Sequence, residues 1–125
     1  MFLVDTNIFL EILLEQDKKV DCKKFLDNNI RNLHITDFSL HSIGIILLKY
    51  DKIKIFQKFI EDVLPNIKLI SLHVELYREI ISIRKTLNFD FDDAYQYGIA
   101  KYFGLNIVIM DRDFERINDV DVLFL

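Results

Sequence analysis

Short, continuous apolar runs alternate with segments of helical periodicity along this chain, and this alternation limits its possible folds most strongly. The runs lie at residues 2–4, 33–35, 67–70, 107–110 and 120–124. Runs without alternating polar residues are typical of strands that are buried on both faces, as in parallel sheets. We therefore predict an α/β fold, a three-layer α/β/α sandwich with a central, mainly parallel sheet of four to five strands. The last run would be an edge strand.

Helices are predicted between these strands, at about residues 8–13, 17–29, 38–48, 52–64, 74–87 and 92–103, with a helical turn at 114–117. Thr36 and Asp37 are suited to cap the third helix. Pro65 should end the fourth helix, and Gly104 the last one as a left-handed C-terminal cap. Right-handed crossovers would bring the carboxyl ends of all parallel strands to one edge of the sheet. With 125 residues and no internal repeat, residues 1–125 are expected to form a single domain.

Composition excludes several classes of protein. The formal charge of −4 argues against a broad basic surface for nucleic acid, although bound divalent cations would reverse the charge of an acidic site. Cys22 is the only cysteine, so neither a disulfide framework nor a cysteine zinc site is expected. The longest uncharged stretch, Phe38–Leu48, is too short to span a membrane, and no signal peptide is visible. We expect a cytoplasmic protein without membrane contact.

Three aspartates that are distant in sequence should meet at the carboxyl edge of the predicted sheet. Asp5 follows the first strand, Asp93 lies at the start of the last long helix, and Asp111 follows the fourth strand. Clustered buried carboxylates repel one another unless a cation neutralises them, and Mg²⁺ or Mn²⁺ prefers such oxygen ligands. An ion held there would activate water and stabilise charge on a phosphate, which is the chemistry of a metal-dependent phosphodiesterase.

Each acid also has a purely structural interpretation. Asp93 could be a first-turn helix acid behind an N-cap at Asp90, and Asp5 could simply cap a helix. Asp92 points about 100° away from Asp93 around a helix, so we favour Asp93 for the site and a solvated or supporting role for Asp92. Asp111 and Asp113 could be loop acids, one of which caps the turn at Phe114.

The order and spacing of several short motifs together resemble the PIN domain family, which includes the VapC-type toxins of prokaryotic toxin–antitoxin pairs. The matching segments are Leu3–Asn7, Asp93-Ala94 with Ala100, Gly104-Leu105 and Ile107–Phe114. The resemblance implies an α/β/α fold and a ribonuclease that depends on Mg²⁺ or Mn²⁺. It assigns Asp5, Asp93 and Asp111 to the first, third and fourth acids of the family, with Asp113 in the same short motif as Asp111.

The second acid of the family has no counterpart. Ser42 stands where the resemblance leads us to expect glutamate, in the helix after the second strand. Asp37 or Glu11 could bind the metal through water, and Asp113 and Asp92 are further candidate ligands. Thr6, Asn7 and Ser42 could orient ligands or the phosphate by hydrogen bonding.

Two functions are compatible with these residues. The resemblance implies a metal-dependent endoribonuclease with an RNA substrate, which could be the toxin of a toxin–antitoxin pair with an antitoxin partner, and a homodimer. Ser42 favours the alternative, a PIN-fold binding module with little or no catalysis. A haloacid-dehalogenase-like phosphatase ranks low because Asn7 stands where that chemistry needs aspartate. Tyr95 and Tyr97 could contact a base, and the apolar helices at 38–48 and 53–64 could supply a dimer face or a partner groove.

Overall fold

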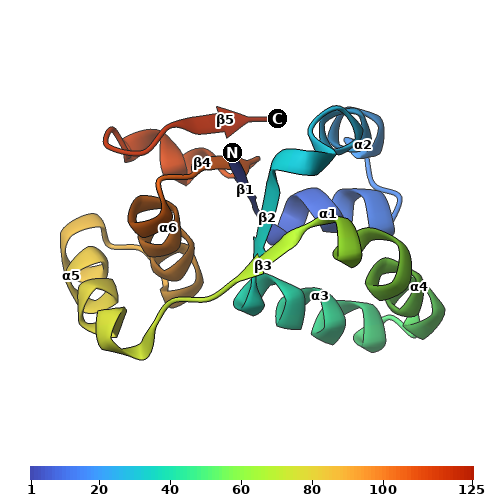
Figure 1. Ribbon diagram of the computed structural model, residues 1–125, viewed down its shortest axis with the longest axis horizontal. Helices are drawn as coiled ribbons and strands as arrows, with labels where there is room; N and C mark the ends of the chain where they lie inside the picture. The colour runs from blue at the N-terminus through green and yellow to red at the C-terminus, as the bar shows by residue number, and fades with distance from the viewer.

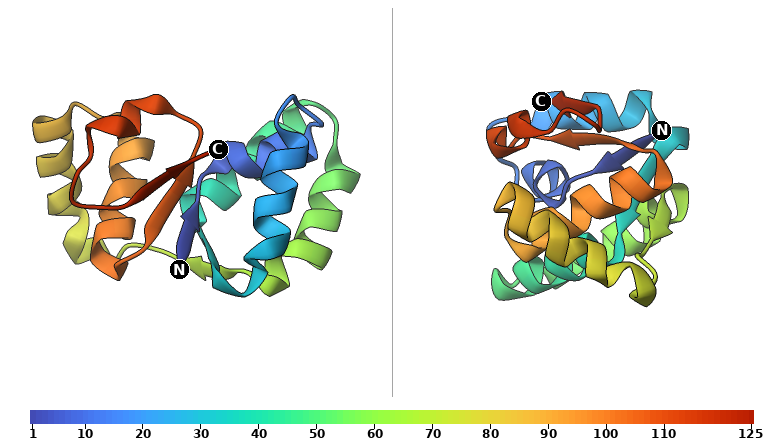
Figure 2. Two further views of the ribbon diagram at one scale, coloured as in Figure 1. Left: turned by 90° about the horizontal axis from the view of Figure 1, so that it is seen from above. Right: turned by 90° about the vertical axis from the view of Figure 1, so that its left-hand side faces the viewer.

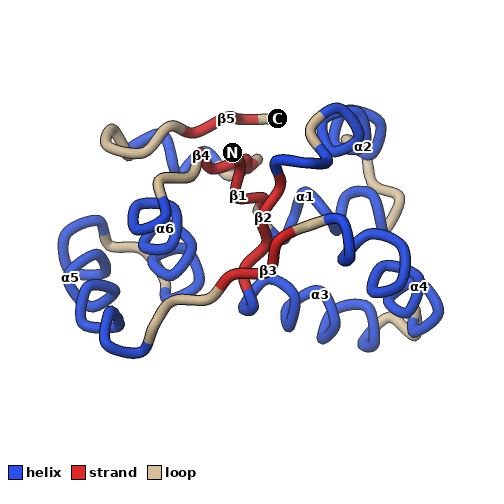
Figure 3. Tube along the Cα trace, in the orientation of Figure 1, coloured by secondary structure: helices blue, strands red, loops and turns tan.

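The computed structural model describes residues 1–125 and contains one sheet of five parallel strands, as predicted. The strands are β1 (Phe2–Val4), β2 (Leu33–Thr36), β3 (Lys68–Ile70), β4 (Asn106–Ile109) and β5 (Val122–Phe124). Their order across the sheet is β3-β2-β1-β4-β5, so β3 and β5 are the edges (Figures 1 and 3). The chain steps in one direction from β1 to β3 and in the other from β4 to β5. The neighbours β1 and β4 therefore form the switch point, where ligands of such sheets usually bind.

Six α-helices connect the strands: α1 (Thr6–Leu13), α2 (Lys19–Asn28), α3 (Asp37–Lys49), α4 (Ile53–Lys58), α5 (Tyr77–Leu87) and α6 (Phe91–Phe103). Shorter helical turns lie at Ile30–Asn32, Phe59–Val63, Leu64–Asn66, Val74–Leu76 and Arg112–Arg116. None of the helices is long and apolar enough to cross a membrane. Gly104 ends α6 with φ of 65°, the left-handed cap that the sequence indicated.

Helices cover both faces of the sheet, which gives the molecule two cores (Figure 2). Alternate residues of a strand point to opposite faces. Leu3 and Ile107 accordingly pack with α5 and α6 on one face, whereas Val4 and Val108 pack with α1, α2 and α3 on the other. Each core has 13 buried residues, so neither face is left open, and the α/β/α prediction is confirmed.

Two predicted helices differ in detail. The helix expected at 52–64 is divided into α4, a wide π-helical turn at Phe59–Val63 and a tight turn at Leu64–Asn66 that contains Pro65. The helix expected at 74–87 begins with the tight turn Val74–Leu76. Ile45 and Leu48 of α3 are 70% and 52% exposed.

Candidate active site

A polar cleft of about 400 Å³ opens at the carboxyl edge of the sheet, beside the switch point. It is acidic, and its carboxylates come from Asp5, Asp90, Asp92, Asp93, Asp111 and Asp113. Its other polar side chains are Thr6, Asn7, Thr36, Ser39, Ser42 and Gln96. The cleft therefore collects side chains from the ends of β1, β2 and β4, from the first two turns of α1, α3 and α6, and from the turn Arg112–Arg116.

Asp5 joins β1 to α1 and is held by the backbone on both sides. Its N–H donates to Val108 of β4 at 3.0 Å, and its Oδ2 caps α1 by accepting from Asn7 N–H at 3.2 Å. The residue is buried, and burial raises the pKa of Asp5 to about 6, although the amides of Asn7 and Thr6 partly oppose the shift. Asp111 raises the pKa further by repulsion. Asp5 is thus a buried acid that a cation would stabilise in its ionised form.

Asp93 lies half-buried in the first turn of α6. Burial, followed by repulsion from Asp92, Asp111 and Asp5, raises the pKa of Asp93 to about 7. An acid at a helix N-terminus usually has a lowered pKa, because the helix dipole favours its charge. Burial is the largest cause of this opposite shift of the Asp93 pKa, and the charges of neighbouring acids add to it. Raised carboxylate pKa values of this kind cluster at functional sites, so the role of Asp93 as a metal-site acid stays a prediction.

Asp111 caps the turn Arg112–Arg116 through its Oδ1, which accepts from Asp113 N–H at 2.8 Å. Both side chains are exposed and line the cleft. Asp111 also raises the pKa of Asp5 and of Asp93 by repulsion, which places its charge near both. The capping bond occupies only one oxygen of Asp111, and the other remains free to face the cleft.

The predicted place of the missing acid is filled by hydroxyl groups. The Thr6 hydroxyl donates to Ser39 Oγ at 2.9 Å, and Thr36 Oγ1 accepts from Ser39 N–H at 2.9 Å. Ser42 lies one turn further along α3, half-buried, and also lines the cleft. This part of the cleft, where the second acid was expected, therefore offers neutral hydroxyl oxygens and no carboxylate.

Glu11 and Asp37 do not lie in the cleft, which corrects the expectation that either could bind a metal there through water. Glu11 Oε2 accepts from Lys18 N–H at 3.3 Å, at the far end of α1. Asp37 Oδ1 accepts from the Tyr95 hydroxyl at 2.8 Å. Helix α1 carries Glu11 about 6 Å along its axis beyond Asn7 and away from the edge of the sheet.

The carboxylates of the cleft fit a divalent cation that keeps several of its water ligands better than one that is bound by protein side chains alone. No three His, Cys, Asp or Glu side chains are arranged to hold a metal ion by themselves. Mg²⁺ commonly uses one or two carboxylates and keeps several waters. Asp5 and Asp93, both with raised pKa values, and the nearby Asp111 are oxygen donors of this kind.

Comparison with known families agrees with this geometry. The family model described as the PIN domain matches residues 2–120 of the chain. The chain belongs to the PIN domain family. Comparison with curated protein sequences gives no match.

Several solved structures share the fold of this PIN domain. The toxin–antitoxin complex from Klebsiella pneumoniae superposes with a TM-score of 0.80 at 18% identity, over 98% of this chain and 96% of that one. VapBC2 from Rickettsia felis, bound to a DNA fragment from its promoter, superposes with a TM-score of 0.82 at 15% identity, over 98% of this chain and 97% of that one. VapC20 from Mycobacterium tuberculosis, a toxin that cleaves the sarcin-ricin loop, gives 0.80 at 13% identity, over 96% and 98%. At these identities the likeness establishes the fold alone.

Sequence reasoning missed several residues of the PIN-domain cleft. Asp90 is the N-cap of α6, yet its side chain makes no capping bond and lines the cleft instead. Gln96 follows Asp93 by three residues, a spacing that places both on one helix face and could have revealed it. Its amide lies near enough to Asp5 to lower that pKa, while its buried Nε2 has no hydrogen bond of normal geometry. Phe38 also lines the cleft.

Tyr95 and Tyr97, proposed as base contacts, are only 2% and 5% exposed, so that prediction is wrong. Tyr95 instead ties two elements together. Its hydroxyl donates to Asp37 on α3 and accepts from the buried Leu72 N–H at 3.0 Å.

Tyr95→Phe is expected to lower the free energy of unfolding by about 1–3 kcal/mol, because Leu72 N–H would stay buried without a partner. Urea unfolding of both proteins measures the loss. Tyr102→Phe is the matched control, since Tyr102 is 59% exposed on the same helix. Equal stabilities of Tyr95→Phe and the control would contradict the bridging role.

Proposed function

We propose that this PIN domain is an endoribonuclease that depends on Mg²⁺ or Mn²⁺, and that it acts as the toxin of a toxin–antitoxin pair. The convergence of Asp5, Asp93 and Asp111 on one cleft, with the pKa values of Asp5 and Asp93 raised, carries the proposal. RNA is the substrate that family membership favours, and the sarcin-ricin loop cleaved by VapC20 is consistent with it.

Each residue has a distinct role in this proposal. Asp5, Asp93 and Asp111 hold the cation, directly or through water, and Asp92 and Asp113 add negative charge at its rim. When bound, the ion supplies a Lewis acid that activates water and neutralises charge on the phosphate. Asn7 and Ser42, which both line the cleft, offer hydrogen bonds to the phosphate or to water. Thr6 holds the wall in place through its bond to Ser39.

Incubation of the purified chain with single-stranded RNA tests the activity directly. We expect internal cleavage with Mn²⁺ and none with EDTA. Cleavage that continues in EDTA, or that is absent with both Mg²⁺ and Mn²⁺, would overturn the proposal.

A protein partner is supported by an apolar groove of about 540 Å³ between α3 and the turn after α4. Ile45, Leu48 and Ile60 line it and are 70%, 52% and 42% exposed. Exposed apolar patches of this kind mark interfaces, and a partner helix or a second copy of the chain would cover it. The structures from Klebsiella pneumoniae and Rickettsia felis are toxin–antitoxin assemblies, which is consistent with an antitoxin partner here.

Alone in solution the chain is expected to form a homodimer. Light scattering should give twice the chain mass of 14.9 kDa. Ile45→Lys should shift the mass toward the monomer if α3 forms the interface, and the exposure of Ile45 means that the substitution should leave the fold intact. If light scattering shows that the unaltered chain stays monomeric at high concentration, the homodimer prediction is wrong.

A binding module without useful catalysis is the second candidate, and Ser42 favours it because that part of the cleft has no carboxylate. Ser42→Glu should tighten Mn²⁺ binding at least about tenfold if that part of the cleft merely lacks a carboxylate, since a charged oxygen ligand replaces a neutral one. Thermal unfolding across a Mn²⁺ titration reports the change. A variant whose melting temperature responds to Mn²⁺ no more than that of the unaltered chain would show that Ser42 does not border the ion.

A further inference from the structure

We propose that Gln96 is a positioning residue of the acidic cleft, whose side-chain amide holds the Asp5 carboxylate at a fixed place relative to Asp93, where both acids can share a divalent cation. The inference rests on the metal-dependent function proposed above and adds a neutral residue to the site. Gln96 acts through Asp5 and is not itself a catalytic residue.

Gln96 is a buried polar residue whose amide is not fully paired within the chain. The residue is 5% exposed, and its Nε2 is buried without a hydrogen bond of normal geometry. Such a donor destabilises the fold, because it has lost its water partners and has gained no full replacement. Buried polar groups of this kind are few in native structures, and each calls for an explanation. Because Gln96 lines the acidic cleft, a role in that cleft explains the amide where packing does not.

The position of Gln96 connects two acids that come from different elements. Gln96 follows Asp93 by three residues of α6, which places the two side chains about 60° apart around the helix axis. Asp5 lies at the end of β1, where the backbone amides of Thr6 and Asn7 face its carboxylate. Among the groups that lower the pKa of Asp5 against the effect of burial, Gln96 is the one side-chain donor. The amide therefore reaches from the helix that carries Asp93 to the carboxylate of Asp5.

A fixed Asp5 carboxylate has particular value in this cleft because the second acid of the family is missing. The affinity of a protein site for a cation depends on the charge count of its ligands and on its rigidity. Ser42 lowers the charge count, so the rigidity of the remaining acids carries more weight. Groups that hydrogen-bond to metal ligands fix the orientation of those ligands, and their loss typically weakens metal binding by about 10-fold to 100-fold.

Calorimetric titration of the full chain with Mn²⁺, together with urea unfolding in EDTA, tests the inference. Gln96→Met keeps the length of the side chain and removes the amide, and it should bind Mn²⁺ at least about tenfold more weakly. The metal-free variant should be no less stable than the unaltered chain, because the substitution removes a buried donor that lacks a hydrogen bond of normal geometry.

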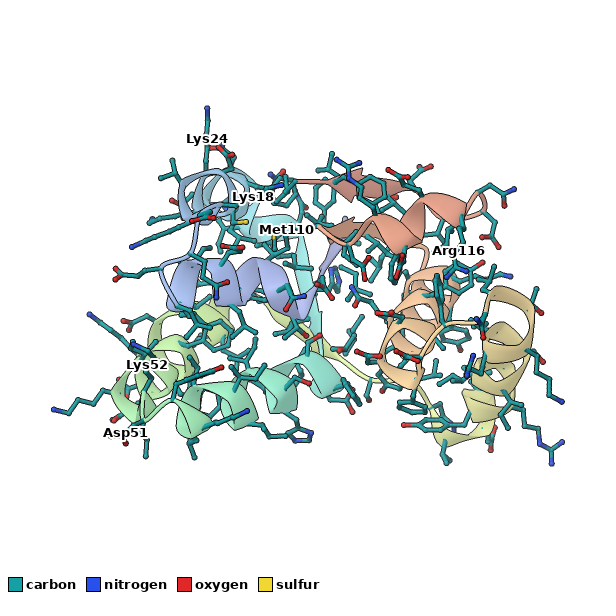
Figure 4. The ribbon with its side chains drawn as sticks, turned by 180° about the vertical axis from the view of Figure 1, so that it is seen from behind. Lys18, Lys24, Asp51, Lys52, Met110 and Arg116 are labelled. Atoms are coloured by element: carbon teal, nitrogen blue, oxygen red, sulfur yellow. The ribbon has the colours of Figure 1, made fainter.

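The matched control is Gln57→Met, the same chemical change on α4, which should bind Mn²⁺ as the unaltered chain does. Gln57 is exposed. Figure 4 shows Asp51 and Lys52, just before α4, on the side of the molecule opposite the orange helix α6.

A second measurement does not depend on whether Gln96→Met folds. In NMR spectra of the isotopically labelled, metal-free protein, the side-chain amide resonances of Gln96 should shift in Asp5→Asn and stay in place in Asp17→Asn. Asp17 is exposed between α1 and α2, so it provides the same chemical change away from the cleft. An amide that only fills space would not respond to the charge of Asp5.

The inference requires weaker Mn²⁺ binding by Gln96→Met at undiminished metal-free stability, and Gln96 resonances that respond to Asp5→Asn. It is overturned if Gln96→Met binds Mn²⁺ as the unaltered chain does, if its weaker binding comes with a loss of stability in EDTA, or if the Gln96 resonances do not respond. None of these results would count against the ribonuclease function. Failure of the unaltered chain to bind Mn²⁺ would instead overturn the metal-dependent function, and the role of Gln96 with it.

Discussion

Asp93→Asn is expected to lower the rate of Mn²⁺-dependent RNA cleavage by about 100-fold to 1,000-fold, the usual loss when one electrostatic contribution to a transition state is removed. The substitution keeps the shape of the side chain and removes the charge that would lie beside a bound ion. The raised pKa of Asp93 shows that its charge is costly without a cation. The substitution should therefore leave the metal-free fold at least as stable as before.

The matched control is Asp17→Asn, the same chemical change on an exposed residue between α1 and α2. Single-turnover cleavage of one labelled RNA compares the three proteins, and urea unfolding in EDTA confirms that all are folded. If Asp93→Asn cleaves as fast as Asp17→Asn, then Asp93 takes no part in the reaction.

The metal-free protein is expected to lose stability as the pH rises, and bound Mn²⁺ should reverse this dependence. The pKa of Asp5 is about 6 and that of Asp93 about 7 in the folded chain, against 3.8 for an ordinary aspartate. Both groups therefore hold protons more tightly when folded, and their stabilising contribution is lost as the pH rises from about 4 to about 7. For the buried Asp5 the shift corresponds to about 2–3 kcal/mol. Mn²⁺ binds the ionised carboxylates, so its stabilising effect grows over the same range.

Urea unfolding at pH 5 and pH 8 measures the free energy of unfolding. In EDTA it should be lower at pH 8, and with saturating Mn²⁺ it should be higher at pH 8. Asp5→Asn removes the buried acid, and its metal-free stability should depend less on pH than that of the unaltered chain. The same pH dependence in Asp5→Asn and the unaltered protein would contradict the role given to Asp5.

The sheet could be predicted because each strand is marked by a short apolar run in its own sequence. A buried parallel strand such as Phe2–Val4 is apolar on both faces, and both faces are indeed covered by helices. The division of the helix at 52–64 was not predictable in this way. Phe59 is buried against Phe9 with ring centroids 5.5 Å apart, so the wide turn at Phe59–Val63 coincides with a contact between segments distant in sequence.

The three central acids were predictable for a similar reason, since each lies at the end of a strand or the start of a helix, and the topology then brings them together. The error over Tyr95 has a physical cause. Tyr95 lies two residues after Asp93, about 200° around the helix, and therefore faces the core. Phe38 and Phe91 are the exposed rings next to the cleft, and they lie side by side only because the fold brings the first turns of α3 and α6 to the same edge of the sheet.

The binding of Mn²⁺ to the full chain tests the central claim most directly, because it asks whether the converging acids hold a cation at all. Isothermal titration calorimetry at about pH 6.5 should show binding with release of protons, since Asp5 and Asp93 are partly protonated there and must ionise. Asp5→Asn and Asp111→Asn should each bind at least about tenfold more weakly, and Asp17→Asn should bind normally. No binding by the unaltered chain, or equal binding by all four proteins, would contradict a metal site at this cleft.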